Sequence, residues 1–437
     1  MKKRQESKQG LINLDCLISD LRAKFNSIKD HRGANSKFSL TDLLMSGFAM
    51  FQLKYPSLLQ FETQSKCEAD NLRTLYGVKE LCTDAQLRNV LDQVDPEPIR
   101  DYFADYYERL KSLGVVDQYG GFYKGYKIIA IDGVEHFSSK EVHCSHCQER
   151  RQQNGSVTYS HSMLCAALVC PNCPEVFPLT IEPITKQDGE VKNDCERNAA
   201  VRLMNYMSNN YKNEKFIIAG DALYANAPYV RQIKANNWEY VLNVKPDGHK
   251  TLFAGFESRR LNGVLSHTSY PDQKGGRYSF WWAKNLPLCN AAPDVRVNML
   301  WCEREDKNGN VTRFTWITSL PLNKNNIHKI MMIGRSRWKI ENETFNTLKN
   351  QGYNFEHNYG HGFKHLSTIL AYLMLMAFLI DQIHQKCSKD FQKLWKTVGT
   401  KAKLWNTVRA LFSTHYLDSF KELFSRMTEL FPTKIQT

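Results

Sequence analysis

The chain has 437 residues, of which 42% are hydrophobic, 12% aromatic and 24% charged. These proportions are typical of a folded globular protein and exclude wholesale disorder, a collagen-like repeat and a multispan membrane protein. Its 58 lysines and arginines against 45 acidic residues give a net charge of +13, which favours a polyanionic partner such as nucleic acid. At about 150 residues per domain, the length allows two or three domains.

The first ten residues are charged and no apolar stretch follows them, so we expect no secretory signal and a cytoplasmic location. The most apolar stretch, residues 369–380, has 12 residues. A bilayer span needs about 20, so we expect a buried helix and no membrane partner. The 12 cysteines are then expected to be thiols or metal ligands rather than disulfides, because the cytosol keeps thiols reduced.

Residues 1–118 are predicted to be helical. Between Leu11 and Gly114 apolar residues recur at the three- and four-residue spacing of amphipathic helices, as in LTDLLMSGFAMFQL. Thr83, followed three residues later by Gln86, has the pattern of a capping box. The segment predicts four or five helices ahead of the first strand.

From residue 119 to 385 the pattern is that of a mixed α/β core. The run KIIAIDGV is typical of a strand buried on both faces and leads to Asp132, and KFIIAGDALY leads in the same way to Asp221. The other core elements are expected as strands at 162–170 and 176–184, helices at 193–211 and 225–236, and a strand in WEYVLNVKP. The order β-β-β-α-β-α-β predicts one sheet with crossover helices.

A β-rich insertion is predicted at about residues 250–322. Its segments YSFWWAKNL, VRVNMLWCERE and TRFTWITSL are rich in aromatic and β-branched residues, and DKNGN at 306–310 is a turn signal between two of them. Helical periodicity resumes after the insertion and ends in the very apolar helix. Residues 386–437 are predicted to form a basic helical tail, with ten lysines and arginines against four acids and a net charge of +6.

Three acidic residues are candidates for an active site. Asp132 and Asp221 both end apolar strands of the predicted sheet, where active groups of α/β proteins collect. Taken singly, each is more simply a turn residue. Glu341 follows Arg337 by one helical turn, so the arginine can orient the carboxylate or bind a phosphate beside it. Taken singly, such a pair is usually a solvated ion pair.

Together, the strand IIAIDG, the strand IIAGDALYAN and the helix segment RWKIENETFNTLK resemble the DDE transposases of bacterial insertion sequences, in the subgroup with a β insertion before the final glutamate. The resemblance covers about residues 126–385. It implies an α/β fold with a ribonuclease-H-like, retroviral-integrase-type mixed sheet core. The β-rich insertion interrupts this core, and a helical N-terminal domain and a helical C-terminal tail flank it.

The family signature around the last glutamate is a tyrosine, two residues, an arginine, three residues, the glutamate, six residues and a lysine. Arg337 and Glu341 match this spacing, whereas Gly334 stands at the tyrosine position and Lys349 falls one place late. On a regular α-helix Lys349 would lie about 80° around from Glu341 rather than nearly above it. The segment YNFEHNYGHG, also similar to a branch of these transposases, makes Glu356 an alternative third acid.

The resemblance implies a two-metal active site. DNA cleavage and strand transfer must activate a water or a 3′ hydroxyl and stabilise the departing oxygen. Two Mg²⁺ ions about 3.5 to 4 Å apart serve both needs, with Mn²⁺ as a substitute. Asp132 is expected to bridge both ions, with Asp221 on one and Glu341 on the other. Arg337 and Lys349 are expected to contact DNA phosphates.

Four cysteines form two CxxC pairs, separated by 22 residues, with the spacing of a zinc site: Cys144 and Cys147, then Cys170 and Cys173. Four thiolates leave no open position for water, so the expected zinc is structural and staples a hairpin over about residues 143–174. Buried free cysteines are the alternative to a metal. Three nearby histidines are alternatives to one thiolate: His143, His146 and His161.

Two further polar groups are predicted to be ordinary structure. The acid cluster around Glu196 opens a helix, where negative charge complements the helix dipole, so we expect it to be solvated. His357, His361 and His365 have helical spacing, but glycines interrupt the helix. We therefore expect a loop near the active site and no metal there.

These features favour a DNA transposase that binds the terminal inverted repeats of its own element and performs Mg²⁺-dependent cleavage and strand transfer. The helical N-terminal region is expected to bind DNA. The expected partners are double-stranded DNA, both terminal repeats and target, and a second copy of the chain in a homodimeric synaptic complex. The expected location is the nucleoid-associated cytoplasm of a bacterium. The alternatives are a ribonuclease-H-like nuclease without joining activity and a co-opted, non-catalytic DNA-binding protein.

Overall fold

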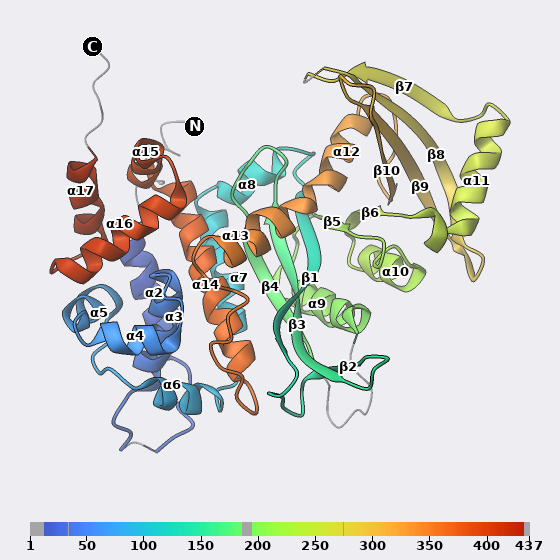
Figure 1. The fold of residues 1–437 in the computed structure, drawn as a ribbon. Helices are drawn as coiled ribbons and strands as arrows, with labels where there is room; N and C mark the ends of the chain where they lie inside the picture. Colours follow the sequence, from blue (N-terminus) through green and yellow to red (C-terminus); the bar gives the residue numbers. More distant parts are fainter. Residues whose placement is uncertain (1–12, 34, 186–194, 274, 432–437) are drawn as a thin grey trace, which may run out of the picture.

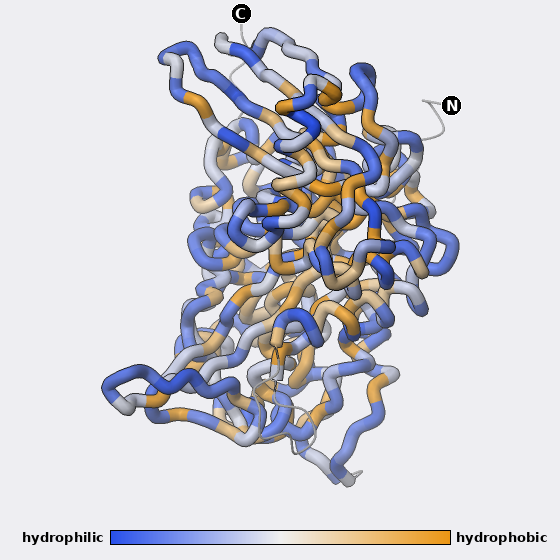
Figure 2. The backbone as a smooth tube through the Cα atoms, turned by 90° about the vertical axis from the view of Figure 1, so that its right-hand side faces the viewer, coloured by the Kyte–Doolittle hydropathy of each residue, from blue (hydrophilic) through white to orange (hydrophobic). Residues whose placement is uncertain are grey.

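The computed structural model describes residues 13–33, 35–185, 195–273 and 275–431. One large mixed β-sheet runs through the molecule (Figure 1). Helices cover its faces, and a helical region lies beside one end of the sheet. In Figure 2 the interior segments are mainly orange and the peripheral loops mainly blue, so the apolar residues gather inside.

Seven described helices precede the sheet: α2 (Leu14–Asn26), α3 (Leu40–Gln52), α4 (Leu58–Ser65), α5 (Ala69–Tyr76), α6 (Asp84–Leu91), α7 (Glu97–Ser112) and α8 (Val115–Gly120). The predicted number of four or five was too low. Four of the seven have only six to eight residues, about two turns, and so short a helix leaves little periodicity to count. The predicted capping box at Thr83 and Gln86 is confirmed at the start of α6.

Six strands form the central part of the sheet: β1 (Lys127–Ser139), β2 (Gln148–Arg151), β3 (Val157–Val169), β4 (Phe177–Ile184), β5 (Phe216–Gly220) and β6 (Glu239–Asn243). β1 pairs antiparallel with β3 and parallel with β5, and β5 pairs parallel with β6. β3 also pairs antiparallel with β4 and with the short β2. The predicted succession of core strands and helices is confirmed, with β2 added.

Two helices connect the parallel strands, α9 (Glu196–Asn210) before β5 and α10 (Ala227–Ala235) before β6. Parallel strands need such crossovers because the end of one strand and the start of the next lie at opposite edges of the sheet. Apolar residues of α9 are buried on one helix face: Ala199, Ala200, Leu203, Met204 and Met207. Asn193 and Asp194, where this helix was expected to begin, lie outside the described residues.

The insertion begins with a helix and continues as four strands: α11 (Lys250–Leu261), β7 (Ser266–Pro271), β8 (Arg277–Cys289), β9 (Ala292–Glu305) and β10 (Val311–Thr318). Its predicted β-rich character is confirmed. Because β10 pairs antiparallel with β6, the insertion extends the central sheet instead of forming a separate one (Figure 1). In the predicted turn, the Asp306 carboxylate accepts the backbone amides of Asn308 and Asn310.

After the insertion the chain runs through α12 (Ile327–Ser336), a π-helix (Ile340–Phe345) and α13 (Asn346–Asn350), and then forms α14 (Leu366–Cys387). α14 has 22 residues and is long and apolar enough to cross a membrane by length and composition. However, 94% of its most apolar window is buried. It packs against α3, α7 and β4, as expected for a core helix.

The C-terminal segment folds as three helices: α15 (Lys389–Val398), α16 (Lys401–Thr414) and α17 (Phe420–Leu430). They lie beside the N-terminal helices (Figure 1). The Asn71 side chain donates hydrogen bonds to the carbonyls of Phe412 and His415, each at 2.7 Å. The Asp15 carboxylate accepts the amide of Phe420 at 2.7 Å. The first and last described helices, α2 and α17, therefore pack together.

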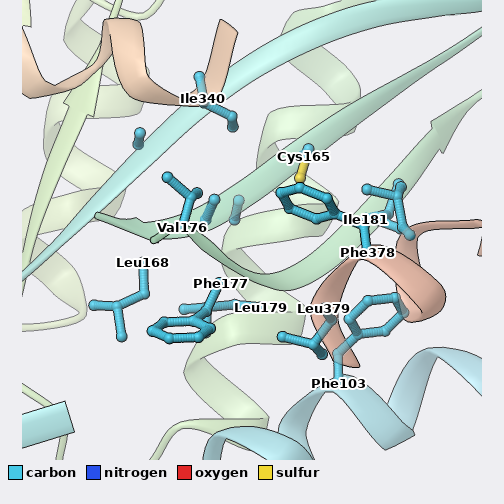
Figure 3. Close-up of a cluster of buried hydrophobic side chains, with 14 of the residues drawn as sticks. Phe103, Cys165, Leu168, Val176, Phe177, Leu179, Ile181, Ile340, Phe378 and Leu379 are labelled. Carbon is cyan, nitrogen blue, oxygen red and sulfur yellow. The ribbon is translucent and has the colours of Figure 1, made fainter. Parts of the chain in front are cut away.

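The hydrophobic core lies between the central strands and the helices that cover them. Figure 3 shows Cys165 of β3 and Ile181 of β4 close to Phe378 of α14, with Phe103 of α7 beneath them. Ile340 of the π-helix lies over β1 in the same view and is fully buried. Burial of Ile340 fixes the position of the next residue, Glu341, relative to the sheet.

Candidate active site

The register of two parallel strands brings Asp132 and Asp221 together. Ala130 of β1 pairs with Ala219 of β5, so the residues two positions further along each chain lie side by side. Neighbouring strands are about 4.8 Å apart. Asp132 uses one carboxylate oxygen to accept its neighbour's amide at 3.1 Å, and Asp221 accepts the amide of Leu223 at 2.8 Å. Each acid therefore keeps one carboxylate oxygen that these backbone amides do not use.

Arg337 connects Glu341 to Asp132. Nη1 of Arg337 lies 2.8 Å from Oδ2 of Asp132 and 2.7 Å from Oε1 of Glu341. The Arg337 side chain is 8% exposed, the Asp132 side chain 15% and the Glu341 side chain 46%. The structure thus brings Asp132, Asp221, Glu341 and Arg337 to one site from β1, the end of β5 and the segment after α12.

The electrostatics of this site favour a bound cation. Burial and the neighbouring Glu341 carboxylate raise the pKa of Asp132, and the Arg337 guanidinium opposes them. Three carboxyl groups, those of Asp132, Asp221 and Glu341, thus lie around the single guanidinium of Arg337. The donor atoms are carboxylate oxygens, which Mg²⁺ and Mn²⁺ accept. The residues present therefore fit a divalent metal.

A fourth acid lies against the site. A Cβ atom built on Gly133 would meet the Glu196 carboxylate at 2.9 Å, and the Tyr224 hydroxyl donates a hydrogen bond to Glu196. Burial and nearby Asp221 raise the pKa of Glu196, and the Tyr224 hydrogen bond opposes them. The expectation of a solvated helix start was therefore wrong for Glu196, which is half-buried beside β1, whereas Cys195, Arg197 and Asn198 at the same helix start are exposed.

The comparison with known protein families decides the class of this domain. Residues 181–379 match the model of the family described as transposase DDE domain. The chain contains a DDE transposase domain. The match covers just under half of the chain and includes Asp221 and Glu341, whereas Asp132 lies before it. No curated protein matches the chain.

A solved structure that matches is described as the crystal structure of the NurA nuclease from Sulfolobus solfataricus. It has 13% sequence identity and a TM-score of 0.24, and the match covers 55% of this chain and 83% of that chain. At this TM-score the match carries no argument about the fold.

A π-helical turn of the DDE transposase domain accounts for the position of Lys349. Residues 340–345 form a π-helix, which takes one residue more per turn than an α-helix. Because the extra residue takes up about 100° of rotation, Lys349 lies about −20° around the helix axis from Glu341 instead of the 80° expected on a regular α-helix. The lysine of the family signature lies at the same angle from its glutamate. Lys349 itself forms an ion pair with Glu356 at 2.8 Å.

Glu356, the alternative third acid, forms its ion pair with Lys349 and not with Arg337. It follows α13 in the loop before α14, its side chain is 69% exposed, and Lys349 is its ion-pair partner. Glu341 shares Arg337 with Asp132. The geometry therefore favours Glu341.

Gly334 stands where the family signature has a tyrosine, and the structure gives a steric reason. A Cβ atom on Gly334 would lie 2.3 Å from Nε1 of Trp316. The glycine therefore lets α12 pack directly on β10, whose Trp316 side chain is 2% exposed. A tyrosine at this position is excluded by that contact.

The four-cysteine zinc site was wrong. Cys144 and Cys147 follow the end of β1, whereas Cys170 and Cys173 follow the end of β3. β1 and β3 are antiparallel strands of 13 residues each, so the two pairs lie at opposite ends of a hairpin about 40 Å long. The second pair lies against the segment between α12 and the π-helix, where Lys339 donates a hydrogen bond to the Cys173 carbonyl at 2.6 Å.

The first cysteine pair has other partners. Cys144, Cys147, His161 and His361 offer ligand atoms that all lie within 4.8 Å of one another. Of the three histidines considered as substitutes for a thiolate, His161 joins the group. Contrary to the expected absence of a metal site in the His361 loop, this loop folds back onto the hairpin and places His361 in a group that could hold a metal ion.

Proposed function

We propose that this protein is a DNA transposase of a bacterial insertion sequence. It would bind the terminal inverted repeats of its own element and carry out DNA cleavage and strand transfer. The observation that carries the proposal is the convergence of Asp132, Asp221 and Glu341 on one site, in a chain with a DDE transposase domain.

The proposed core is ribonuclease-H-like, of the retroviral-integrase type. The strand order β4-β3-β1-β5-β6 supports this assignment, since the first three strands are antiparallel and the last two run parallel to β1. The strands β7–β10 then form the insertion that precedes the final glutamate. This strand order would place Asp132 and Asp221 on neighbouring strands in the middle of the core sheet.

Asp132, Asp221 and Glu341 would hold two Mg²⁺ ions, which supply activation of the attacking oxygen and stabilisation of the leaving oxygen. Mn²⁺ would substitute. Asp132 interacts with both other acids and would be the central ligand of this set. Arg337 is held by Asp132 and Glu341, and its guanidinium would turn to a DNA phosphate once cations neutralise these acids. Glu196 would orient the strand at Gly133 and add negative charge beside Asp221.

DNA would approach along a groove next to the active-site helix. This groove has a volume of about 670 Å³ and is lined by Arg335, Trp338, Lys339 and residues of β7 and β8. Trp338 is 41% exposed. The cations and the exposed aromatic ring suit a phosphate backbone and a base, although Asp272 and Glu343 also line the groove. The net charge of +13 over the whole chain would offset the repulsion between DNA and the carboxylates.

The proposed assembly is a homodimer that holds two element ends, in the bacterial cytoplasm at the nucleoid. The helical N-terminal residues 1–118 would read the end sequence, residues 119–385 would carry the chemistry, and the basic tail, residues 386–437, would contact phosphates. The packing of α17 on α2 supports a single DNA-binding body made from both ends of the chain.

Product analysis tests this function. Purified full-length protein is incubated with Mg²⁺, a labelled DNA fragment that ends in the inverted repeats flanking its gene, and a target plasmid. Joined products with the label in the plasmid are expected. Cleaved ends without joined products would favour the nuclease alternative. Specific binding without cleavage in Mg²⁺ or Mn²⁺ would favour the non-catalytic DNA-binding protein.

A further inference from the structure

We propose that Cys144, Cys147, His161 and His361 bind one zinc ion that fastens the loop before α14 to the tip of the β1–β3 hairpin. No step of the proposed DNA chemistry uses these residues. They come from three segments: the connection after β1, the strand β3 and residues 351–365.

Five of the six distances among the four ligand atoms match a tetrahedral zinc site, and the sixth, between Cys144 and His361, is within 4.8 Å. The Sγ atoms of Cys144 and Cys147 are 3.9 Å apart, and Nε2 of His161 lies 3.5 and 3.4 Å from them. Nε2 of His361 lies 3.1 Å from the Cys147 sulfur and 3.1 Å from Nε2 of His161. Tetrahedral zinc with bonds of about 2.3 Å to sulfur and 2.0 Å to nitrogen requires edges of about 3.8, 3.5 and 3.3 Å.

The surroundings orient the ligands. Nδ1 of His361 lies 2.7 Å from the Gly362 carbonyl, so this nitrogen carries the hydrogen and Nε2 presents a lone pair. The Phe137 ring packs on the His361 ring with centroids 4.5 Å apart. Cys147, His161 and His361 are 1%, 3% and 7% exposed. Three of the four ligands are therefore buried and held in place, and Cys144 at the edge of the site is half-buried.

The charge of the site also suits zinc. Binding converts both thiols to thiolates and releases two protons to solvent. Zn²⁺ with two thiolates and two neutral imidazoles then has no net charge, which suits a buried position. Four protein ligands leave no place for water, so the ion would be structural.

The zinc would stabilise the loop that connects Glu341 to the core helix α14. His361 lies in this loop, and the following amides, residues 363–366, are bound by the Asp92 carboxylate. Phe137 lies five residues beyond Asp132 on β1, so the metal would be about 17 Å from the active site. Its loss would loosen the loop and lower stability without removing any active-site group.

Metal analysis of the purified full-length chain tests the proposal. About one zinc per chain is expected, and exchange for Co²⁺ should give the visible absorption of tetrahedral cobalt with thiolate charge-transfer bands. Cys144→Ser, Cys147→Ser and His361→Asn should each lose the metal. Cys170→Ser and Cys173→Ser are matched controls that remove the other CxxC pair and should keep it.

A measurement on the unaltered protein tests the proposal even where a variant fails to fold. Thiol alkylation followed by peptide mapping should protect Cys144 and Cys147 until a chelator is added, whereas exposed Cys16 and Cys67 react in both states. Zinc well below one per chain after reconstitution, a Cys144–Cys147 disulfide, or loss of zinc in Cys170→Ser would overturn the proposal. The DNA-joining assay can succeed or fail independently of these results.

Discussion

Asp132 and Glu341 accept hydrogen bonds from the same nitrogen of Arg337, at 2.8 and 2.7 Å. β1 supplies the first acid and the segment after the β-rich insertion supplies the second. One guanidinium therefore links two acids that lie about 200 residues apart in the sequence. It also holds two carboxylates together that would otherwise repel each other. Arg337 therefore occupies the place that metal ions would take over.

Substitution of Arg337 by Gln leaves two neighbouring carboxylates without a counter-charge. We expect the metal-free protein to lose about 1 to 3 kcal/mol of unfolding free energy, less than for a fully buried pair because Glu341 is 46% exposed. Mg²⁺ should stabilise Arg337→Gln more than the wild type, because the ions replace the missing charge. Urea unfolding with and without Mg²⁺ measures both effects. Arg335→Gln is the control, and equal Mg²⁺ shifts in all three proteins would contradict the account.

Substitution of Gly133 by Ala forces a side chain into the space of the Glu196 carboxylate, since the new Cβ would lie 2.9 Å from it. The strand next to Asp132 must shift, or Glu196 must leave Tyr224. We expect the rate of Mg²⁺-dependent DNA cleavage to fall by about 100-fold, as for other small displacements of reacting groups. Gly33→Ala is the control, because its Cβ would meet nothing within 4 Å. A wild-type cleavage rate in Gly133→Ala would show that Glu196 has no role in the active site.

Substitution of Gly334 by Ala places a methyl group against the Trp316 ring, 2.3 Å from Nε1. Overpacking of this kind costs about 1 to 3 kcal/mol, measured by chemical unfolding. The smaller ring of Trp316→Phe should recover part of that loss in the double variant, since it also removes the buried Nε1 that has no hydrogen-bond partner. Strictly additive effects of the two substitutions would show that α12 and β10 do not meet as described.

Substitution of Asp92 by Asn tests the anchor of the loop before α14. Although burial opposes it, hydrogen bonds from the backbone amides of residues 363–366 lower the pKa of Asp92. A lowered folded-state pKa gives stability that is present above the unfolded value of about 3.9 and is lost as pH falls through the folded value. Asp92→Asn should lose about 1 to 3 kcal/mol at neutral pH and show a smaller decline below pH 4. Exposed Asp95→Asn should change neither, and an unchanged decline in Asp92→Asn would contradict this role.

The sequence predicts the strand-borne part of the site well. Asp132 and Asp221 each follow an apolar run, and the order of the runs makes their strands parallel neighbours. Local pattern and topology are enough here, because the register follows from equivalent positions in two similar strands. The helix spacing of Arg337 and Glu341 was likewise readable, since it spans a single turn.

Contacts that depend on chain direction over long distances were not predictable. The two CxxC pairs look like one site in the sequence, but antiparallel pairing of β1 and β3 moves them apart. His361 joins Cys144 only because a loop folds back over more than 200 residues of chain. The π-helix that repositions Lys349 also has no simple signal, since an extra residue in a turn is visible only once the family spacing is compared with the backbone.

Asp132, Asp221 and Glu341 together would form the metal-dependent active site. The most direct measurement is the rate of Mg²⁺-dependent cleavage of element-end DNA by Asp132→Asn, Asp221→Asn and Glu341→Gln, with Glu356→Gln as the control. Each of the three should lose about a thousandfold or more in rate, since each would remove roughly 4 kcal/mol of transition-state stabilisation. The control should cleave at the wild-type rate. Wild-type cleavage by any of the three, or loss of cleavage in Glu356→Gln, would contradict the account.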